Sequence, residues 1–455
     1  MNDTTIGAVA VSTRELERAN FNAIATALDH AIGNGERYTA WLEGESSDFV
    51  RMNRGKVRQA GHVEQRILRV QLVRGARHAS HCLTLEGDAA KDCNAAVAAI
   101  DGLRSALPEL ADDPYLMLPD SVQNSDEVRA DELPNPGTII ESVLDAARGE
   151  DLVGIYAAGP VWRAFANSEG QRNWHLVTTF NLDWSLYYRA DKAVKSMLAG
   201  FAWSDETLRA KMELARERLA LIARPPKSLE PGRYRAFLAP SAMEEVVSLL
   251  RWGAFSGRGL ATQQSALTRM ESGEKLDPRM TICEDFAGGV APRFQSAGFT
   301  RPARVPLVEK GALVGSLVSP RTAREFDLTA NGANEWESPE SIAIEGGTLM
   351  NADALSALDR GLFVGNLWYT NYSDRNACRM TGMTRFATFW VEDGKIVAPI
   401  NVMRFDDSLY RILGTNLEAL TDTPELMLSS ESYGSRHLTS VKAPGVLVSE
   451  MEFTL

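Results

Sequence analysis

The sequence predicts an α+β protein with N-terminal α/β domains and a large β-rich C-terminal domain. In the first half, stretches with apolar residues at helical spacing alternate with stretches of strand-like alternation. After residue 227, glycine-bounded strand-like segments recur, and only one helix is clear. At 455 residues, the chain is long enough for two or three domains with buried cores.

The N-terminal α/β domain is predicted to span residues 1–110. A helix is expected over residues 15–32, where apolar side chains recur every three or four positions before two closely spaced glycines. Residues 38–85 alternate between apolar and polar side chains, which indicates strands, and two glycines mark the turns. A second helix is expected over residues 88–107.

A middle α/β domain is predicted over residues 137–226, after a linker at residues 111–136 that is rich in prolines and acids. The domain begins with a helix around residues 139–147. It ends with a charged helix over residues 205–223, for which Ser204 is the expected N-cap. Short strands are expected at residues 152–158, 161–166 and 175–188.

The β-rich C-terminal domain is predicted over residues 227–455. Its one clear helix follows Pro240, and its start is typical of a capping box with Ser241 at the N-cap and Glu244 at the third helical position. Apolar residues on most sides, up to Trp252, indicate that this helix is buried. Glycine-containing turns are expected at residues 309–311, 345–347 and 392–394.

Composition excludes several classes of protein. The net charge of −12 opposes non-specific binding to nucleic acid. The chain has four cysteines and no CxxC pair, so reduced thiols in a cytosol are expected. No signal peptide is evident, and no uncharged apolar run approaches the roughly 18 residues of a membrane span. We therefore expect a cytoplasmic protein with no nucleic-acid or membrane partner.

Four stretches, in their order and spacing, resemble those of one protein family. Glycine-containing turns and the strands beside them make up these stretches, and no single one is specific. They are Phe165–Gly170, Ala254–Gly257, Pro306–Leu313 with Thr322–Ala323, and Thr381–Phe386 with Phe389–Ile396 and Pro399–Ile400. On these grounds the chain resembles the TldD/PmbA family, the "modulator of DNA gyrase" metallopeptidase group, which implies a C-terminal domain of the TldD/PmbA type.

The resemblance also implies where a zinc site would lie. The metal-bearing branch of the family carries His-Glu-x-x-x-His on the helix of the third region, with a cysteine ligand nearer the C-terminus. Laid on this chain, the two histidines and the glutamate fall on Ser248, Gly253 and Leu249, none of which supplies a zinc ligand or a general base. The resemblance is therefore to the PmbA/TldE-like branch, with no metal ligand, catalytic residue or cofactor in this chain.

In that branch the implied partner is a TldD-like subunit that carries the zinc. The implied function is the non-zinc subunit of an assembly that cleaves unfolded or precursor peptides. Two alternatives stay open: a non-catalytic homodimeric scaffold or peptide-binding protein, and a stand-alone hydrolase that uses Cys378 or an unrecognised site. Cys378 lies among arginines, which would lower its pKa.

Further side chains are candidates for contacts with a peptide or a partner subunit, although core packing explains aromatic clusters equally well. These candidates are Trp368, Tyr369, Tyr372, Thr381, Gly382 and Arg385. His78 and His81 would face opposite sides of a strand, so we do not expect a metal site there. The adjacent acids of the Asp406-Asp407 and Glu244-Glu245 pairs seldom converge, so capping or solvation explains them better than catalysis.

Overall fold

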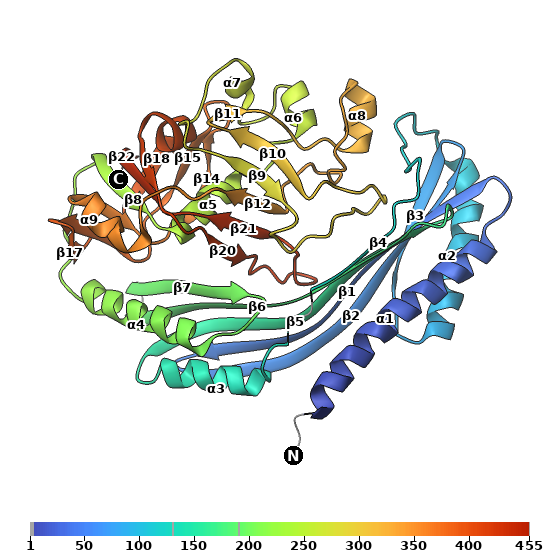
Figure 1. Cartoon of the computed structure of the whole chain (residues 1–455), viewed down its shortest axis with the longest axis horizontal. Helices are drawn as coiled ribbons and strands as arrows, with labels where there is room; N and C mark the ends of the chain where they lie inside the picture. The colour runs from blue at the N-terminus through green and yellow to red at the C-terminus, as the bar shows by residue number, and fades with distance from the viewer. Residues whose placement is uncertain (1–3, 130–131, 190–191, 455) are drawn as a thin grey trace.

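The computed structural model describes residues 4–129, 132–189 and 192–454. A long sheet built by residues 36–200 forms an arm beneath the C-terminal part of the chain (Figure 1). In the C-terminal part, two further sheets and several short helices pack around helix α5 (Pro240–Leu250). This mixture of helices and sheets, with its large β-rich domain, confirms the predicted α+β class.

The N-terminal sheet runs in the order β3-β2-β1-β5-β6-β4, and β7 also pairs with β6. Two-residue turns with positive φ at Gly55 and Gly75 close the β1–β2 and β2–β3 hairpins, as predicted. The strands are β1 (Glu36–Asn53), β2 (Lys56–Arg74), β3 (Arg77–Thr84), β4 (Ser125–Arg129), β5 (Asp151–Asn167), β6 (Arg172–Arg189) and β7 (Lys192–Gly200).

This sheet joins the regions that the sequence analysis places in two separate domains. Strand β1 pairs with β5 from Thr39 to Met52, and β4, which lies inside the predicted linker, pairs in parallel with β6. The two strands predicted at residues 152–158 and 161–166 are one strand, β5. Pairing between residues more than 100 positions apart leaves no local signal, so the sequence could not reveal the shared sheet.

Helices cover the two ends of the N-terminal sheet (Figure 1). Helices α1 (Thr4–Ala31) and α2 (Ala89–Ala106) pack together at one end, and α3 (Pro136–Ala146) and α4 (Asp205–Ile222) lie at the other. As predicted, the Ser204 hydroxyl caps α4, since it accepts a hydrogen bond from the Thr207 N–H at 3.2 Å. The predicted helices therefore form, and α1 begins earlier than its periodicity indicated.

The C-terminal part contains two sheets. One runs β11-β10-β9-β12-β21-β20, and the other runs β14-β15-β18-β22-β8-β13-β16-β17 with β19 paired to β22. The strands are β8 (Gly232–Leu238), β9 (Ile282–Asp285), β10 (Arg304–Glu309), β11 (Ala312–Leu313), β12 (Ser341–Ile344), β13 (Gly361–Val364), β14 (Trp368–Asp374), β15 (Arg379–Met383), β16 (Thr388–Glu392), β17 (Lys395–Pro399), β18 (Arg404–Ser408), β19 (Leu417–Leu420), β20 (Glu425–Leu428), β21 (Ser440–Ala443) and β22 (Val446–Phe453). Its short helices are α6 (Gly257–Ala261), α7 (Thr268–Glu271), α8 (Pro320–Phe326), η2 (Asn351–Asp353), α9 (Ala354–Leu358) and η3 (Arg411–Thr415), whereas η1 (Leu107–Glu109) follows α2 in the N-terminal part.

Two of the three predicted C-terminal turns are hairpin turns. Residues at positive φ, Lys310-Gly311 and Asp393-Gly394, close the β10–β11 and β16–β17 hairpins. Gly346 and Gly347 instead lie on a connection from β12 to η2. A Cβ on Gly346 would lie 2.4 Å from the Asp422 carbonyl oxygen, so a close backbone approach requires glycine here.

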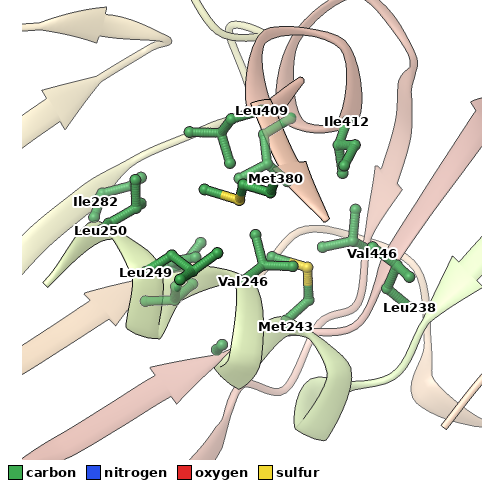
Figure 2. Close-up of a cluster of buried hydrophobic side chains, with 14 of the residues drawn as sticks. Leu238, Met243, Val246, Leu249, Leu250, Ile282, Met380, Leu409, Ile412 and Val446 are labelled. Carbon is green, nitrogen blue, oxygen red and sulfur yellow. The ribbon is translucent and has the colours of Figure 1, made fainter. Parts of the chain in front are cut away.

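Helix α5 occupies the centre of the largest core cluster, as its apolar sequence predicted. Figure 2 shows Met243, Val246, Leu249 and Leu250 of this helix among side chains from both C-terminal sheets. The predicted capping box is wrong. The N-cap is Ala239, without a side-chain hydrogen bond, because Pro240 occupies the first turn and its fixed φ starts the helix before Ser241.

Candidate functional site

The last turn of α5 is where the family resemblance places a zinc motif. Ser248 and Leu249 lie in this turn, and Leu249 is buried in the core. Gly253 lies beyond the end of the helix with φ of 81°. Across residues 4–129, 132–189 and 192–454, no group of three or more His, Cys, Asp or Glu side chains is placed to hold a metal ion. The residues present do not fit a zinc ion.

A cavity of about 400 Å³ lies beside this turn. Glu244, Glu245 and Ser248 line it from α5, Lys195 from β7 and Thr370 from β14. The hydroxyl of Ser248 donates to Glu244 Oε1 at 3.0 Å, and that of Thr370 donates to Glu245 Oε2 at 3.1 Å. The cavity thus joins the N-terminal sheet to the C-terminal core helix, and we call it the α5 cavity.

Several carboxyl groups in and around the α5 cavity are partly shielded from water. Burial raises the pKa of Glu244, and the charge of Glu245 raises it further. Burial also raises the pKa of Glu245 and of Asp183, whose Oδ2 lies 3.4 Å from Lys195 Nζ. Carboxyl, hydroxyl and ammonium groups here offer hydrogen-bond donors and acceptors to a polar ligand.

Residues 429–439, which we call the crossing segment, connect β20 to β21 and reach the N-terminal sheet. Arg436 of this segment is buried against the sheet. Its guanidinium donates to the Gly159 carbonyl at 2.9 Å, and to the carbonyl and hydroxyl oxygens of Thr179 at 3.0 and 2.6 Å. Burial lowers the pKa of Arg436 to about 10, so it stays charged near neutral pH. These bonds anchor the crossing segment to β5 and β6.

A second cavity, of about 340 Å³, also borders the crossing segment. Ser435 and His437 of the crossing segment line it, and the sheet contributes Trp41, Arg69 and Arg163. We call it the sheet cavity. Because Ser429–Glu431 also line the α5 cavity, the crossing segment helps to form the walls of both cavities.

Three of the predicted contact residues form one exposed cluster. The ring centroids of Trp368 and Tyr369 are 5.4 Å apart, and the Arg385 guanidinium lies 4.3 Å from the centre of the Trp368 ring. The Tyr369 side chain is 76% exposed, and its φ of 56° is rare for an aromatic residue. Tryptophan, tyrosine and arginine are the residues that most often dominate binding interfaces.

The other three predicted contact residues make contacts within the C-terminal core. The Tyr372 hydroxyl donates to the Leu249 carbonyl at 2.9 Å, so it braces the end of α5. The Thr381 hydroxyl donates to the Phe405 carbonyl at 2.8 Å. A Cβ on Gly382 would lie 2.7 Å from a Phe405 ring carbon, so the glycine allows β15 to pack against this ring.

Cys378 is buried, and burial raises its pKa to about 12. The predicted lowering of this pKa by neighbouring arginines is wrong. Arg269 and Arg375 do favour the thiolate, but their effect is smaller than the cost of desolvating it. A buried thiol with a raised pKa is a poor nucleophile. All four cysteines are unpaired, and Cys82 is the exposed one.

The other side chains singled out from the sequence have structural partners. His78 lies on β3 with Nε2 3.2 Å from Asp113 Oδ2, and the exposed His81 lies three positions further along the same strand. The buried Asp407 accepts hydrogen bonds from Arg411 Nε at 2.9 Å and from the Glu452 N–H at 3.0 Å. These contacts explain both motifs without catalysis.

Sequence reasoning missed the residues that bring the two parts of the chain together. Lys195 lies on β7, a strand that was not predicted, and Arg436 lies in a loop without periodic pattern. An arginine in a loop of small polar residues gives no local sign of the β5 and β6 oxygens that it contacts. Only the close approach of β5 and β6 to the crossing segment reveals their roles.

No helix in the described part of the chain is long and apolar enough to cross a membrane.

Comparisons with known proteins indicate the family of the C-terminal domain and the fold of the whole chain. The PmbA/TldA metallopeptidase C-terminal domain matches residues 231–455. A search of curated proteins finds no match. TldE from Thermococcus kodakarensis is similar in structure, with a TM-score of 0.75 and 14% identity over 94% of this chain and 100% of that chain.

Two further crystal structures share the fold. One is described as a modulator of DNA gyrase from Thermotoga maritima, with a TM-score of 0.73 and 12% identity over 97% of this chain and 100% of that chain. The other, similarly described, comes from Bacteroides thetaiotaomicron, with a TM-score of 0.74 and 16% identity over 96% and 99% of the two chains. The C-terminal domain therefore belongs to the PmbA/TldA metallopeptidase family, and the chain as a whole has the fold of TldE and of these two modulator proteins.

Proposed function

We propose that this chain is the TldE/PmbA-like, non-zinc subunit of a cytoplasmic TldD/TldE-type metallopeptidase assembly that cleaves unfolded or precursor peptides. The observation that carries the proposal is the end of α5. Leu249, at the glutamate position of the family's zinc motif, points into the core, and Gly253, at a histidine position, has no side chain. A TldD-like partner would supply zinc, its ligands and the general base.

The state of Cys378 argues against the stand-alone hydrolase. A thiol nucleophile acts as a thiolate and needs contact with substrate. The Cys378 side chain is buried in the core, and its pKa is raised. Catalysis is therefore assigned to the partner, and this chain has a binding and positioning role.

In this proposal, the α5 cavity and the sheet cavity hold the peptide, and the exposed Trp368–Tyr369–Arg385 cluster contacts the partner subunit. Both cavities have polar and charged walls, which suit a peptide main chain better than a purely apolar ligand. The aromatic–arginine cluster is the kind of surface that a protein interface buries.

Co-expression with a TldD-like chain tests the proposal. Native mass spectrometry should show a hetero-oligomer whose zinc is lost when the partner's motif is mutated, whereas this chain alone should carry no stoichiometric zinc. Tyr369→Ala should weaken association by about tenfold, as expected for an interface aromatic. Tyr188→Ala, which truncates a tyrosine 53% exposed on β6, is the matched control and should leave association unchanged.

Homodimers alone, with no binding of any TldD-like chain, would favour the scaffold alternative. One zinc per chain, retained by this protein in isolation after mild chelation, would refute the assignment of zinc to the partner.

A further inference from the structure

The sheet cavity contains two arginines that lack a close carboxylate partner. Arg69 is exposed on β2, and its guanidinium has no hydrogen-bond or ion-pair partner among the described residues. Arg163, on β5, is 8% exposed, and its NH1 donates to the Trp162 carbonyl at 2.8 Å. The nearest carboxylate oxygen to Arg163 belongs to Glu43 and lies 3.8 Å away.

The acids of the same cavity are mostly occupied elsewhere. Glu340 pairs with Arg301, a third arginine of the cavity wall. One Glu43 oxygen accepts a hydrogen bond from Trp41 Nε1 at 2.8 Å. Glu335 alone has no partner within the described ranges, and its charge opposes that of the two arginines. Three arginines and three glutamates thus line the cavity, but within the described ranges neither Arg69 nor Arg163 has a carboxylate oxygen at hydrogen-bond distance.

The arrangement of the strands places an aromatic surface beside these donors. Trp41 lies directly opposite Arg69 on the neighbouring strand, so their side chains are adjacent on one face of the sheet. Trp336, which is 77% exposed, lines the cavity from the C-terminal part. Both indole side chains therefore border the same cavity as the two arginines.

We infer that the sheet cavity is a subsite for a peptide carboxylate, held by Arg69 and Arg163 and flanked by Trp41 and Trp336. The inference rests on the proposed peptide-binding role and names the chemistry that this part of the chain selects. Guanidinium groups match the two oxygens of a carboxylate with paired N–H donors, and burial strengthens such charge-assisted bonds. The carboxylate comes from an acidic side chain or from the C-terminus of the peptide.

The test is a fluorescence titration of the full-length chain with short unstructured peptides. One probe is blocked at both ends and has a central glutamate, the second has glutamine in its place, and the third is the glutamine peptide with a free C-terminal carboxylate. At least one carboxylate-bearing probe should bind about tenfold more tightly than the blocked glutamine peptide. The tighter of the two identifies the source of the carboxylate.

Three variants connect this preference to the arginines. Arg69→Gln should reduce the affinity for the carboxylate probe to about the affinity for the blocked glutamine peptide. Arg69→Lys should keep part of the difference between the two affinities. Glu335→Gln should strengthen binding of the carboxylate probe several-fold, because it removes an opposing charge. Arg148→Gln, an exposed arginine after α3 that pairs only with Asp145, is the matched control and should change nothing.

Equal affinities for all three probes, or an Arg69→Gln variant with the full preference, would overturn the inference. Arg69 is exposed, so its substitution does not threaten folding in the way that substitution of Arg163 does. The titration uses this chain alone, so its failure is distinguishable from failure of the proposed subunit role, which depends on association with a zinc-bearing partner.

Discussion

Substitution of Leu250 by aspartate tests the burial of α5, on which the account of the zinc-motif positions rests. Leu250 is 0% exposed and packs in the cluster that Figure 2 shows. Truncation of a fully buried leucine costs about 2–5 kcal/mol of stability. A buried polar group without a partner costs about 1–3 kcal/mol more. We therefore expect Leu250→Asp to lower the free energy of unfolding by about 3–8 kcal/mol, a large part of the 5–15 kcal/mol that is usual for a folded protein.

Urea unfolding at neutral pH, followed by circular dichroism, measures this loss. The matched control is Leu214→Asp in α4, where the leucine is 44% exposed and the change should cost less than about 1 kcal/mol. A Leu250→Asp protein with the same transition midpoint as the wild type would refute the burial of α5. Equal losses in the two variants would show that aspartate acts through helix propensity and not through burial.

The remaining predictions concern three other buried groups. Burial raises the pKa of Glu284 to about 7, so the folded state binds a proton that the unfolded chain releases near pH 4, and stability falls as pH rises through this range. Glu284→Gln should therefore be more stable than the wild type at pH 8, by up to about 3 kcal/mol, but not at pH 4 in urea titrations. Arg436→Leu should remove the hydrogen bonds to Gly159 and Thr179 and cost about 3 kcal/mol, with faster hydrogen exchange in the crossing segment; unchanged exchange would contradict its anchoring role. A thiol reagent should modify Cys82 in the native chain and Cys378 only after unfolding, and Cys378→Ala should leave peptidase activity of the assembly within about twofold.

Elements with a strong local pattern could be predicted from the sequence. The helix after Ser204 combines a capping hydroxyl with acids in its first turn, and the structure has both features. The same reasoning fails at Ser241. Ser241 and Glu244 have the spacing of a capping box, but Pro240 before them starts the helix. Where two local signals compete, the sequence does not show which one determines the first turn.

Long-range pairing could not be predicted. Strand β5 is continuous through Gly159, which has a φ of 132°. A Cβ at this position would lie 2.2 Å from the Ser46 carbonyl oxygen, so only glycine fits here. The strands expected at residues 152–158 and 161–166 lie on either side of Gly159-Pro160, a dipeptide that is typical of turns. The pairing of β1 with β5, which decides the architecture, depends on residues that are far apart in the chain.

The candidate site was predictable only in part. The absence of zinc ligands at Ser248, Leu249 and Gly253 follows from residue types alone. The exposure of Trp368 and the burial of Cys378 depend on tertiary packing, so the sequence could name these residues but not separate surface from core. The two cavities lie between parts of the chain whose contact has no local signature.

The most direct test of the central claim is peptide hydrolysis by the reconstituted assembly. This chain and a zinc-bearing TldD-like partner are assayed separately and together on an unstructured peptide, with and without a chelator. We predict cleavage only by the mixture with zinc present, and none when the glutamate of the partner's zinc motif is mutated. Robust cleavage by this chain alone in chelator, free of contaminating protease, would contradict the account.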